Sequence, residues 1–196
     1  MIRYNTMDAM PRYLIYLKNQ DYISGQAGLL LHKARSLVSD MGVVVRDTRV
    51  ATNHIEFDTS IPRDSMVDEV ARRFSAISPI SEYELIVEKK MYKKESILKA
   101  KEFFNEEKYW RAHEVLESEW KVASHEEKDL LNGIILVAAA FVHDEKDEKN
   151  ICISILDRAI KKFSKAEGLY YNIDIDQVKK NVLQIIESRR VQRFRI

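Results

Sequence analysis

The sequence predicts an α+β protein in which an N-terminal ferredoxin-like β-α-β-β-α-β domain precedes an all-α helical bundle domain. Two observations lead to this fold class. Up to about residue 90, short runs rich in β-branched and aromatic residues alternate with runs of helical periodicity; after residue 93 the apolar runs follow a helical period alone. The chain has 196 residues, enough for two small domains. We therefore expect domains at 1–90 and 91–196.

The N-terminal half contains four expected strands, at residues 12–18, 43–46, 50–58 and 82–88. The third alternates Ile55 and Phe57 with polar neighbours, as a half-buried strand does. Two helices are expected at 24–41 and 63–77. Ser24 can begin the first, and Gly42 suits the left-handed position after its end. This order favours an antiparallel sheet with both helices on one face.

The C-terminal half is expected to hold five helices and no strand. The helices cover residues 94–106, 109–123, 126–144, 147–166 and 174–188. Ser124 begins a capping-box pattern for the third, and Gly168 is expected to stop the fourth. The third is apolar almost all round from Leu130 to Val142, so we expect it at the centre of its bundle.

Composition restricts the class of protein. The formal net charge of +1 gives no global bias toward nucleic acid or membranes. Cys152 is the only cysteine, which excludes an internal disulfide and a multi-cysteine metal site and fits a reducing cytoplasm. The most apolar run, at 134–142, is about half the ~20 residues that span a bilayer, and the N-terminus lacks the apolar core of a signal peptide. We expect a cytoplasmic protein without a membrane partner, with Cys152 in the core.

The helix at 109–123 is the strongest candidate for a functional site. Its ideal geometry places Tyr109, His113, Leu116 and Trp120 on one face. Glu117 lies one turn beyond His113, and Glu114 is rotated about 100° from it. Further polar residues of the next helix could complete a cluster with these: Asn132, His143 and Asp144.

Four interpretations of this cluster remain open. The favoured one is structural: a partly buried His113 pairs with a carboxylate and fixes helix register. A second is a zinc, manganese or iron site with His113, Glu117 and His143 as ligands. A third is metal-free acid–base catalysis in which Glu117 orients His113. The fourth is a groove in which the tryptophans and His113 contact a ligand or peptide.

The same helix carries a resemblance to a known family. The pattern Phe104-Asn-x3-Tyr-Trp-x-Ala-His-Glu-Val-Leu-Glu-x2-Trp120 resembles the signature of the domain of unknown function 309 family. The segment from Asn132-Gly133 to His143, and the later helix with Ala159 and Phe163, are also similar to that family. The resemblance covers about residues 94–166.

The resemblance implies a compact all-helical domain but no activity, because none is established for the family. It implies that six residues occupy characteristic family positions: His113, Glu114, Glu117, Trp120, Gly133 and His143. Two departures concern glutamines of the family, where this chain has Asn132 and Leu136. A third replaces a Gly-Asn turn of the family by the charged run that ends at Asn150. These departures weaken any proposal that needs a glutamine in the site.

Nucleic-acid binding has weaker support. The basic end of the chain, with Arg189, Arg190, Arg193 and Arg195, could contact RNA phosphates, but such an end is more often solvated. Tyr13 and Phe57 could stack on RNA bases from a ferredoxin-like sheet, but a place in the core is expected more often.

These observations favour a non-enzymatic cytoplasmic binding or scaffold protein. Its polar groove would lie on the helical domain, with candidate residues His113, Glu114, Glu117, Trp120, Asn132 and His143. One alternative is a metal-dependent, hydrolase-like enzyme that uses the first three, and another is an RNA-associated accessory protein. A divalent metal is the one cofactor that the residues suggest, and a homo-oligomer is compatible with the sequence.

Overall fold

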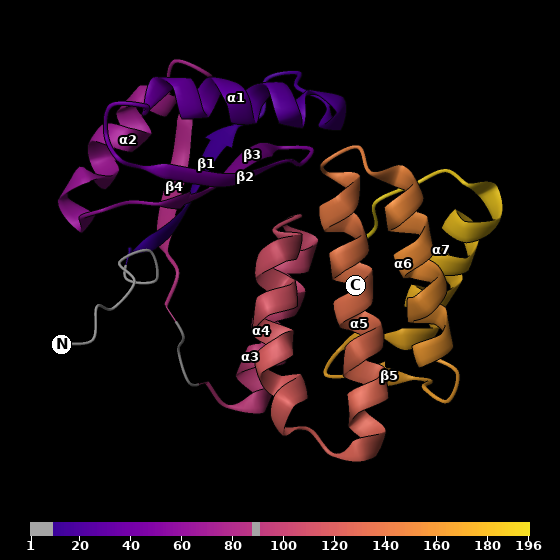
Figure 1. Ribbon diagram of the computed structural model, residues 1–196. Helices are drawn as coiled ribbons and strands as arrows, with labels where there is room; N and C mark the ends of the chain where they lie inside the picture. The colour runs from indigo at the N-terminus through magenta and orange to yellow at the C-terminus, as the bar shows by residue number, and fades with distance from the viewer. Residues whose placement is uncertain (1–9, 88–90) are drawn as a thin grey trace, which may run out of the picture. The chain divides into compact units, whose positions relative to one another are not determined.

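The computed structural model describes residues 10–87 and 91–196, with the side chains of residues 125 and 126 left aside. The chain divides into two compact units, Met1–Lys89 and Lys90–Ile196, and each is described by itself. The first unit is α+β and the second is mostly helical (Figure 1). The last residue of the strand predicted at 82–88 lies outside the described residues.

The N-terminal unit is built on a four-stranded antiparallel sheet, as predicted. Its strands are β1 (Arg12–Lys18), β2 (Val44–Val50), β3 (His54–Ser60) and β4 (Ile80–Leu85), in the spatial order β2-β3-β1-β4. Two short 3₁₀ turns, Ser24–Gln26 and Asp64–Met66, lead into α1 (Ala27–Leu37) and α2 (Val67–Phe74). Both helices cover the same face of the sheet (Figure 1).

Alternating side chains of the sheet meet the helices in one core. Ile15 of β1 lies opposite Phe57 of β3, and both are fully buried. Phe57 also packs against Phe74 of α2, with ring centroids 4.9 Å apart. In α2, Val70 and Phe74 are four residues apart and therefore share the buried face.

Several boundaries of helices and strands differ from the sequence prediction. The helix predicted to reach residue 41 ends at Leu37, although Gly42 does have the positive φ expected of it, at 66°. The strand predicted to begin at Val50 begins at His54 instead. A turn separates it from β2, closed by the Ala51 N–H that donates to the His54 carbonyl at 2.9 Å. Asn19 holds this turn from another loop, since its side-chain amide donates to the Ala51 carbonyl at 2.8 Å.

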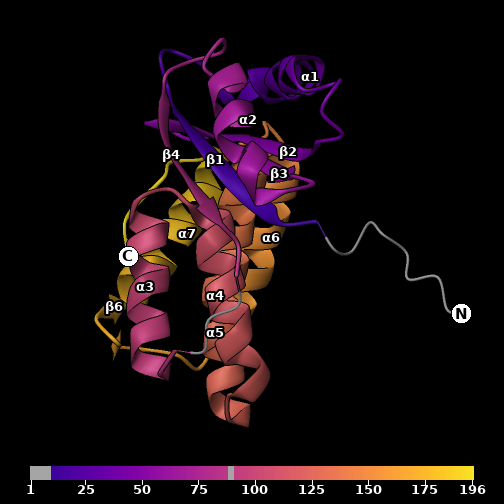
Figure 2. The ribbon, with the colours of Figure 1, turned by 90° about the vertical axis from the view of Figure 1, so that its left-hand side faces the viewer.

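The C-terminal unit contains five helices among the residues described. They are α3 (Lys93–Asn105), α4 (Tyr109–Val122), α5 (His125–Asp144), α6 (Lys149–Lys162) and α7 (Ile175–Ser188). The largely apolar α5 packs between α4 and α6, as predicted (Figures 1 and 2). In the described part of the chain, none of the helices has the length and apolar character needed to cross a membrane.

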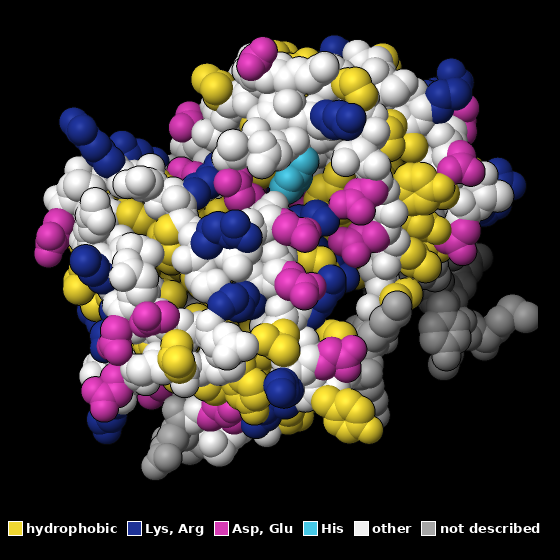
Figure 3. Space-filling model, turned by 180° about the vertical axis from the view of Figure 1, so that it is seen from behind, with side chains coloured by type: hydrophobic (Ala, Val, Ile, Leu, Met, Phe, Trp, Pro, Cys, Tyr) yellow, Lys and Arg dark blue, Asp and Glu magenta, His cyan; other side chains and the backbone are white. Residues whose placement is uncertain are grey.

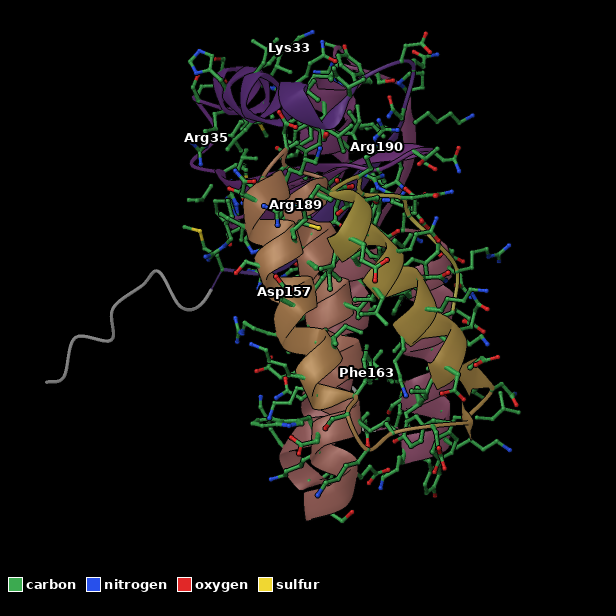
Figure 4. All side chains as sticks on the ribbon, turned by 90° about the vertical axis from the view of Figure 1, so that its right-hand side faces the viewer. Lys33, Arg35, Asp157, Phe163, Arg189 and Arg190 are labelled. Carbon is green, nitrogen blue, oxygen red and sulfur yellow. The ribbon has the colours of Figure 1, made fainter. Side chains whose placement is uncertain are left out.

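Gly133 explains how closely α5 and α6 approach. A Cβ atom at this position would lie 2.5 Å from the ring of Phe163, which is fully buried just after the end of α6 (Figure 4). Only a residue without a side chain lets this ring lie against the backbone of α5.

The prediction that the second half has no strand is wrong. Strands β5 (Leu169–Tyr170) and β6 (Ile173–Asp174) form a short hairpin before α7. Its turn residues Tyr171 and Asn172 both have positive φ, at 45° and 65°, which matches the twist of a two-residue hairpin. Gly168 does not end α6, which ends at Lys162; it directly precedes β5, and its N–H donates to Asp176 of α7 at 2.9 Å.

Candidate functional site

Helix α4 places its functional candidates at the edge of the core. Tyr109, Ala112 and Leu116 are buried, at the spacing that the sequence predicts. His113 follows Ala112 directly, so it lies beside the buried face and keeps 28% of its side chain exposed. This position lets the imidazole contact both core and solvent.

Three side chains of α4 form the candidate site, which we call the α4 cluster: His113, Glu114 and Glu117. Each offers one ligand atom, and these atoms all lie within 4.8 Å of one another. The Nδ1 atom of His113 lies 3.4 Å from Oε1 of Glu114. All three residues are half-buried, so carboxylate charge gathers where water is only partly present.

One ring nitrogen of His113 lacks a hydrogen bond in this cluster. Its Nδ1 atom is buried from solvent and has no hydrogen bond among the described residues. A buried polar atom without a partner is unfavourable by roughly 1–3 kcal/mol. A bound cation would relieve this, because a neutral imidazole nitrogen can donate its lone pair to a metal.

The distances in the α4 cluster are close to those of a metal site. Zinc binds nitrogen and carboxylate ligands at about 2.0–2.2 Å, so two ligands of one ion lie at most about 4.4 Å apart. The pair at 3.4 Å is already within this limit. The wider separations, up to 4.8 Å, would need small side-chain rotations.

His143 lies outside this group. Its Nδ1 atom lies 2.5 Å from Oε2 of Glu148, the residue just before α6, and the Glu148 N–H donates to the His143 carbonyl at 2.9 Å. These contacts close the connection between α5 and α6. The structure therefore gives His143 a nearer carboxylate than those of the α4 cluster.

Two other predicted residues of the site, Asp144 and Trp120, make contacts with groups outside the α4 cluster. Asp144 accepts a hydrogen bond from Arg193 at 2.9 Å. Trp120 packs against the helical core and carries the ammonium of Lys128 over its ring, 5.3 Å from the centroid. Asn132 is half-buried on α5, beside Gly133.

Arg193 is half-buried and paired with carboxylates, whereas the sequence predicted a solvated basic end. Its guanidinium donates to Asp144 and, at 2.8 Å, to Glu107. Burial works to lower the pKa of Arg193, but the carboxylates of Glu145, Asp144 and Glu107 outweigh it and raise that pKa. The apolar residues beside the arginines, such as Phe194, were the signal in the sequence that this end is packed.

The remaining arginines of this end do not share that environment. Arg189, Arg190 and Arg195 are exposed, and the first two lie where the chain leaves α7 (Figure 4). Acidic and basic side chains are interspersed on the face seen from behind (Figure 3). The proposed RNA-stacking aromatics are core residues: Phe57 is fully buried, and the Tyr13 hydroxyl donates to Asp64 at 2.7 Å.

Two surface hollows of the described residues are lined by side chains other than those of the α4 cluster. One lies along α3 and is lined by Tyr92, Lys94, Glu95, Leu98, Lys99 and Glu102. The other lies beside the C-terminal residues, and its lining includes Phe104, Tyr109 and Arg193. Neither is lined by His113, Glu114 or Glu117.

Comparison with known proteins confirms the predicted resemblance. Residues 97–155 match the sequence model of a family described as Domain of unknown function (DUF309). The matched segment runs from α3 into α6 and contains the α4 cluster, Gly133 and His143; the similarity predicted at Ala159 and Phe163 lies beyond it. No curated protein matches the chain. Over residues 97–155, the helical unit resembles the DUF309 family.

Proposed function

We propose that this chain is a non-catalytic binding protein whose helical unit binds a divalent metal ion at the α4 cluster. One observation carries the proposal. The Nδ1 atom of His113 is buried without a hydrogen bond among the described residues, and it lies beside two carboxylates. One imidazole and two carboxylates suit zinc, manganese or ferrous iron.

The geometry favours a metal over the purely structural role for His113. A structural role requires a hydrogen bond that satisfies the imidazole, and the 3.4 Å approach of Glu114 does not supply one among the described residues. A cation would satisfy the imidazole and would also offset repulsion between Glu114 and Glu117.

Binding is favoured over hydrolysis because of where the cluster lies. All three ligands come from one helix, and neither described hollow adjoins them. Three protein ligands leave coordination positions for water or for a group from a partner. A scaffold role, in which the metal helps to hold such a partner, follows from those open positions.

We also infer that the two units are separate domains and that the N-terminal one is ferredoxin-like. The β-α-β-β-α-β order, the antiparallel strand order β2-β3-β1-β4 and the placement of both helices on one face support this assignment.

The test is metal binding by the full chain without an affinity tag. We expect elemental analysis and calorimetric titration to give about one zinc or manganese ion per chain. His113→Ala should remove this binding, and Glu117→Gln should weaken it while keeping the size of the side chain. Lowering the pH should also weaken it, because protons compete with the metal for these ligands.

Two histidine variants serve as matched controls. His32→Ala changes an exposed histidine of α1 and should leave stoichiometry and affinity unchanged. His143→Ala should also leave them unchanged, because the Glu148 carboxylate lies beside its Nδ1 atom. Equal metal binding by the intact chain and by His113→Ala would contradict the proposal.

A further inference from the structure

Residues 190–196 lie against earlier helices of the same unit. Helix α7 ends at Ser188, and Arg189 turns the chain with a left-handed φ of 55°. Residues 190–196, which we call the tail, have no helix or strand. Their apolar residues nevertheless pack against the helical core: Val191, Phe194 and Ile196. Side-chain contacts, rather than secondary structure, therefore position the tail.

An aromatic side chain anchors the middle of the tail. The ring of Phe194 lies 5.9 Å from that of Phe104 and 5.4 Å from that of Phe141, measured between centroids. Tyr109 contacts the same two rings, at 5.0 and 4.9 Å. Phe104, Tyr109 and Phe141 are buried, so they form an apolar receptor for an aromatic residue.

A positive charge anchors the tail one residue earlier. Arg193 donates to Glu107 of the α3–α4 loop at 2.8 Å and to Asp144 at the end of α5 at 2.9 Å. Glu145, which is 2% exposed, contributes further negative charge. Two carboxylates placed on either side of one guanidinium favour arginine at this position, because its several N–H groups can reach both.

The main chain of the tail is also bound. The Ile196 N–H donates to Oδ1 of Asn105 at 2.8 Å, and Nδ2 of Asn105 donates to the main-chain oxygen of Ile196 at 3.1 Å. One amide side chain thus pairs with both polar groups of one residue. Such bonds hold an extended backbone whatever its side chains, as in other peptide-binding sites.

The residues that receive the tail come from a different part of the sequence. We call them the tail site: Phe104, Asn105, Glu107, Tyr109, Phe141 and Asp144. All of them lie within residues 97–155, the segment that matches the DUF309 family, whereas the tail lies outside it. The family-like segment therefore supplies a site, and a separate segment occupies it.

The tail does not fill this site completely. A hollow of about 80 Å³ remains, lined by both tail and helix residues: Phe104, Asn105, Glu107, Tyr109, Arg193, Phe194 and Arg195. The Tyr109 hydroxyl is buried and has no hydrogen bond among the described residues. A segment with a polar group at this point could satisfy it.

We propose that the tail site is a peptide-recognition site and that the chain's own tail occupies it. The matching partner is an extended protein segment with an arginine, an aromatic residue directly after it, and a further residue two positions on that is held by its main chain. Such a segment competes with the tail. This site is separate from the α4 cluster, so the proposal does not depend on metal binding.

The test measures binding of a labelled peptide with the sequence of residues 190–196 to the full chain. In the intact chain the attached tail has an effective concentration of about millimolar, so we expect weak binding. In the double variant Arg193→Ala/Phe194→Ala the tail is released, and the peptide should bind at least about tenfold more tightly. Adding Asn105→Ala should weaken that binding by about fivefold to tenfold, because both main-chain bonds are lost.

A scrambled peptide of the same composition and the variant Arg190→Ala are the controls. The scrambled peptide should not bind, and Arg190→Ala should behave as the intact chain because this side chain is exposed and does not line the hollow. Failure of a folded double variant to bind the peptide, or equal binding of the scrambled one, would overturn the proposal.

A second measurement applies if the double variant does not fold. Hydrogen exchange at the Ile196 amide of the intact chain reports release of the tail, because this amide is bound by Asn105. Millimolar peptide should accelerate that exchange, and the scrambled peptide should not. Exchange that is unaffected by both peptides would count against competition at this site.

Discussion

Two groups of carboxylates on the helical unit differ in the cation that accompanies them. At the tail site, Glu107 and Asp144 surround Arg193, whose guanidinium donates a hydrogen bond to each. At the α4 cluster, Glu114 and Glu117 lie beside the imidazole of His113, whose Nδ1 atom has no hydrogen bond among the described residues. The first group holds a guanidinium through hydrogen bonds, whereas the second holds an imidazole nitrogen that could still bind a cation.

The difference follows from where each group lies. Arg193 is brought in by a distant segment and is held between helices, so its charge pairs serve the packing of the tail. The α4 cluster comes from consecutive turns of one helix and remains half-exposed, so an ion from solvent can reach it. Carboxylates alone therefore do not indicate a metal site; the nature of the neighbouring cation decides.

The largest expected loss of stability comes from removal of the Arg193 guanidinium. Arg193→Ala would leave Asp144 and the buried Glu145 without their positive partner, and removal of one partner of a buried pair costs about 3 kcal/mol. Urea unfolding followed by tryptophan fluorescence measures this, because both tryptophans lie on α4. Arg195→Ala should change stability by less than about 0.5 kcal/mol. Equal effects of the two would remove the contrast between the clusters.

The next largest loss of stability concerns packing rather than charge. Gly133→Ala should destabilise the helical unit by about 1–3 kcal/mol, because the new methyl group would overlap the Phe163 ring. At temperatures where the variant is folded, its metal stoichiometry should equal that of the intact chain. A variant as stable as the intact chain would show that Phe163 can move without cost.

Metal should stabilise the intact chain but not the cluster variant. At a free zinc concentration of ten times Kd, linkage predicts a gain of about 1.4 kcal/mol in the free energy of unfolding. The gain should be absent in His113→Ala and present in His143→Ala, in the same urea experiment. The same gain in all three proteins would place the metal elsewhere.

The smallest expected effect on stability concerns the thiol of Cys152. Its reactivity tests whether solvent reaches the core near the tail site. Burial raises the pKa of this thiol to about 12, with Asp144 adding to the rise. Folding therefore favours the protonated thiol, a contribution that is present below the unfolded pKa of 9.0 and lost as the pH rises through about 12. A thiol reagent at pH 8 should label the urea-unfolded chain and leave the folded one unlabelled. Rapid labelling of the folded chain would indicate an open core.

Local patterns in the sequence predicted much of the fold. Helical spacing placed Tyr109, Ala112 and Leu116 on the buried face of α4, and the four-stranded antiparallel sheet followed from alternating apolar residues. The hairpin β5–β6 was missed because its strands have two residues each, too short to show a period. Its turn at Tyr171 and Asn172 lacks the glycine that usually signals one.

For the candidate site too, the contacts within one helix were predicted and the contacts between elements were not. His113 and Glu117 are one helical turn apart, so sequence spacing was enough to bring them together. The expected contribution of His143 depended on how two helices align and on the loop after α5. In that loop Glu148 lies close enough to pair with His143, and no local pattern indicates such a contact.

The sequence by itself determined the five helices of the second half, the four-stranded sheet, the α4 cluster and the resemblance to the DUF309 family, because each depends on patterns among residues near one another in the chain. Only the tertiary structure decided which groups the basic end of the chain contacts. Arg193, Phe194 and Ile196 meet partners that lie about fifty to ninety residues away in the chain. Which distant groups meet depends on how all the helices pack. Because of this packing, the tail, which was expected to be solvated, lies in the tail site.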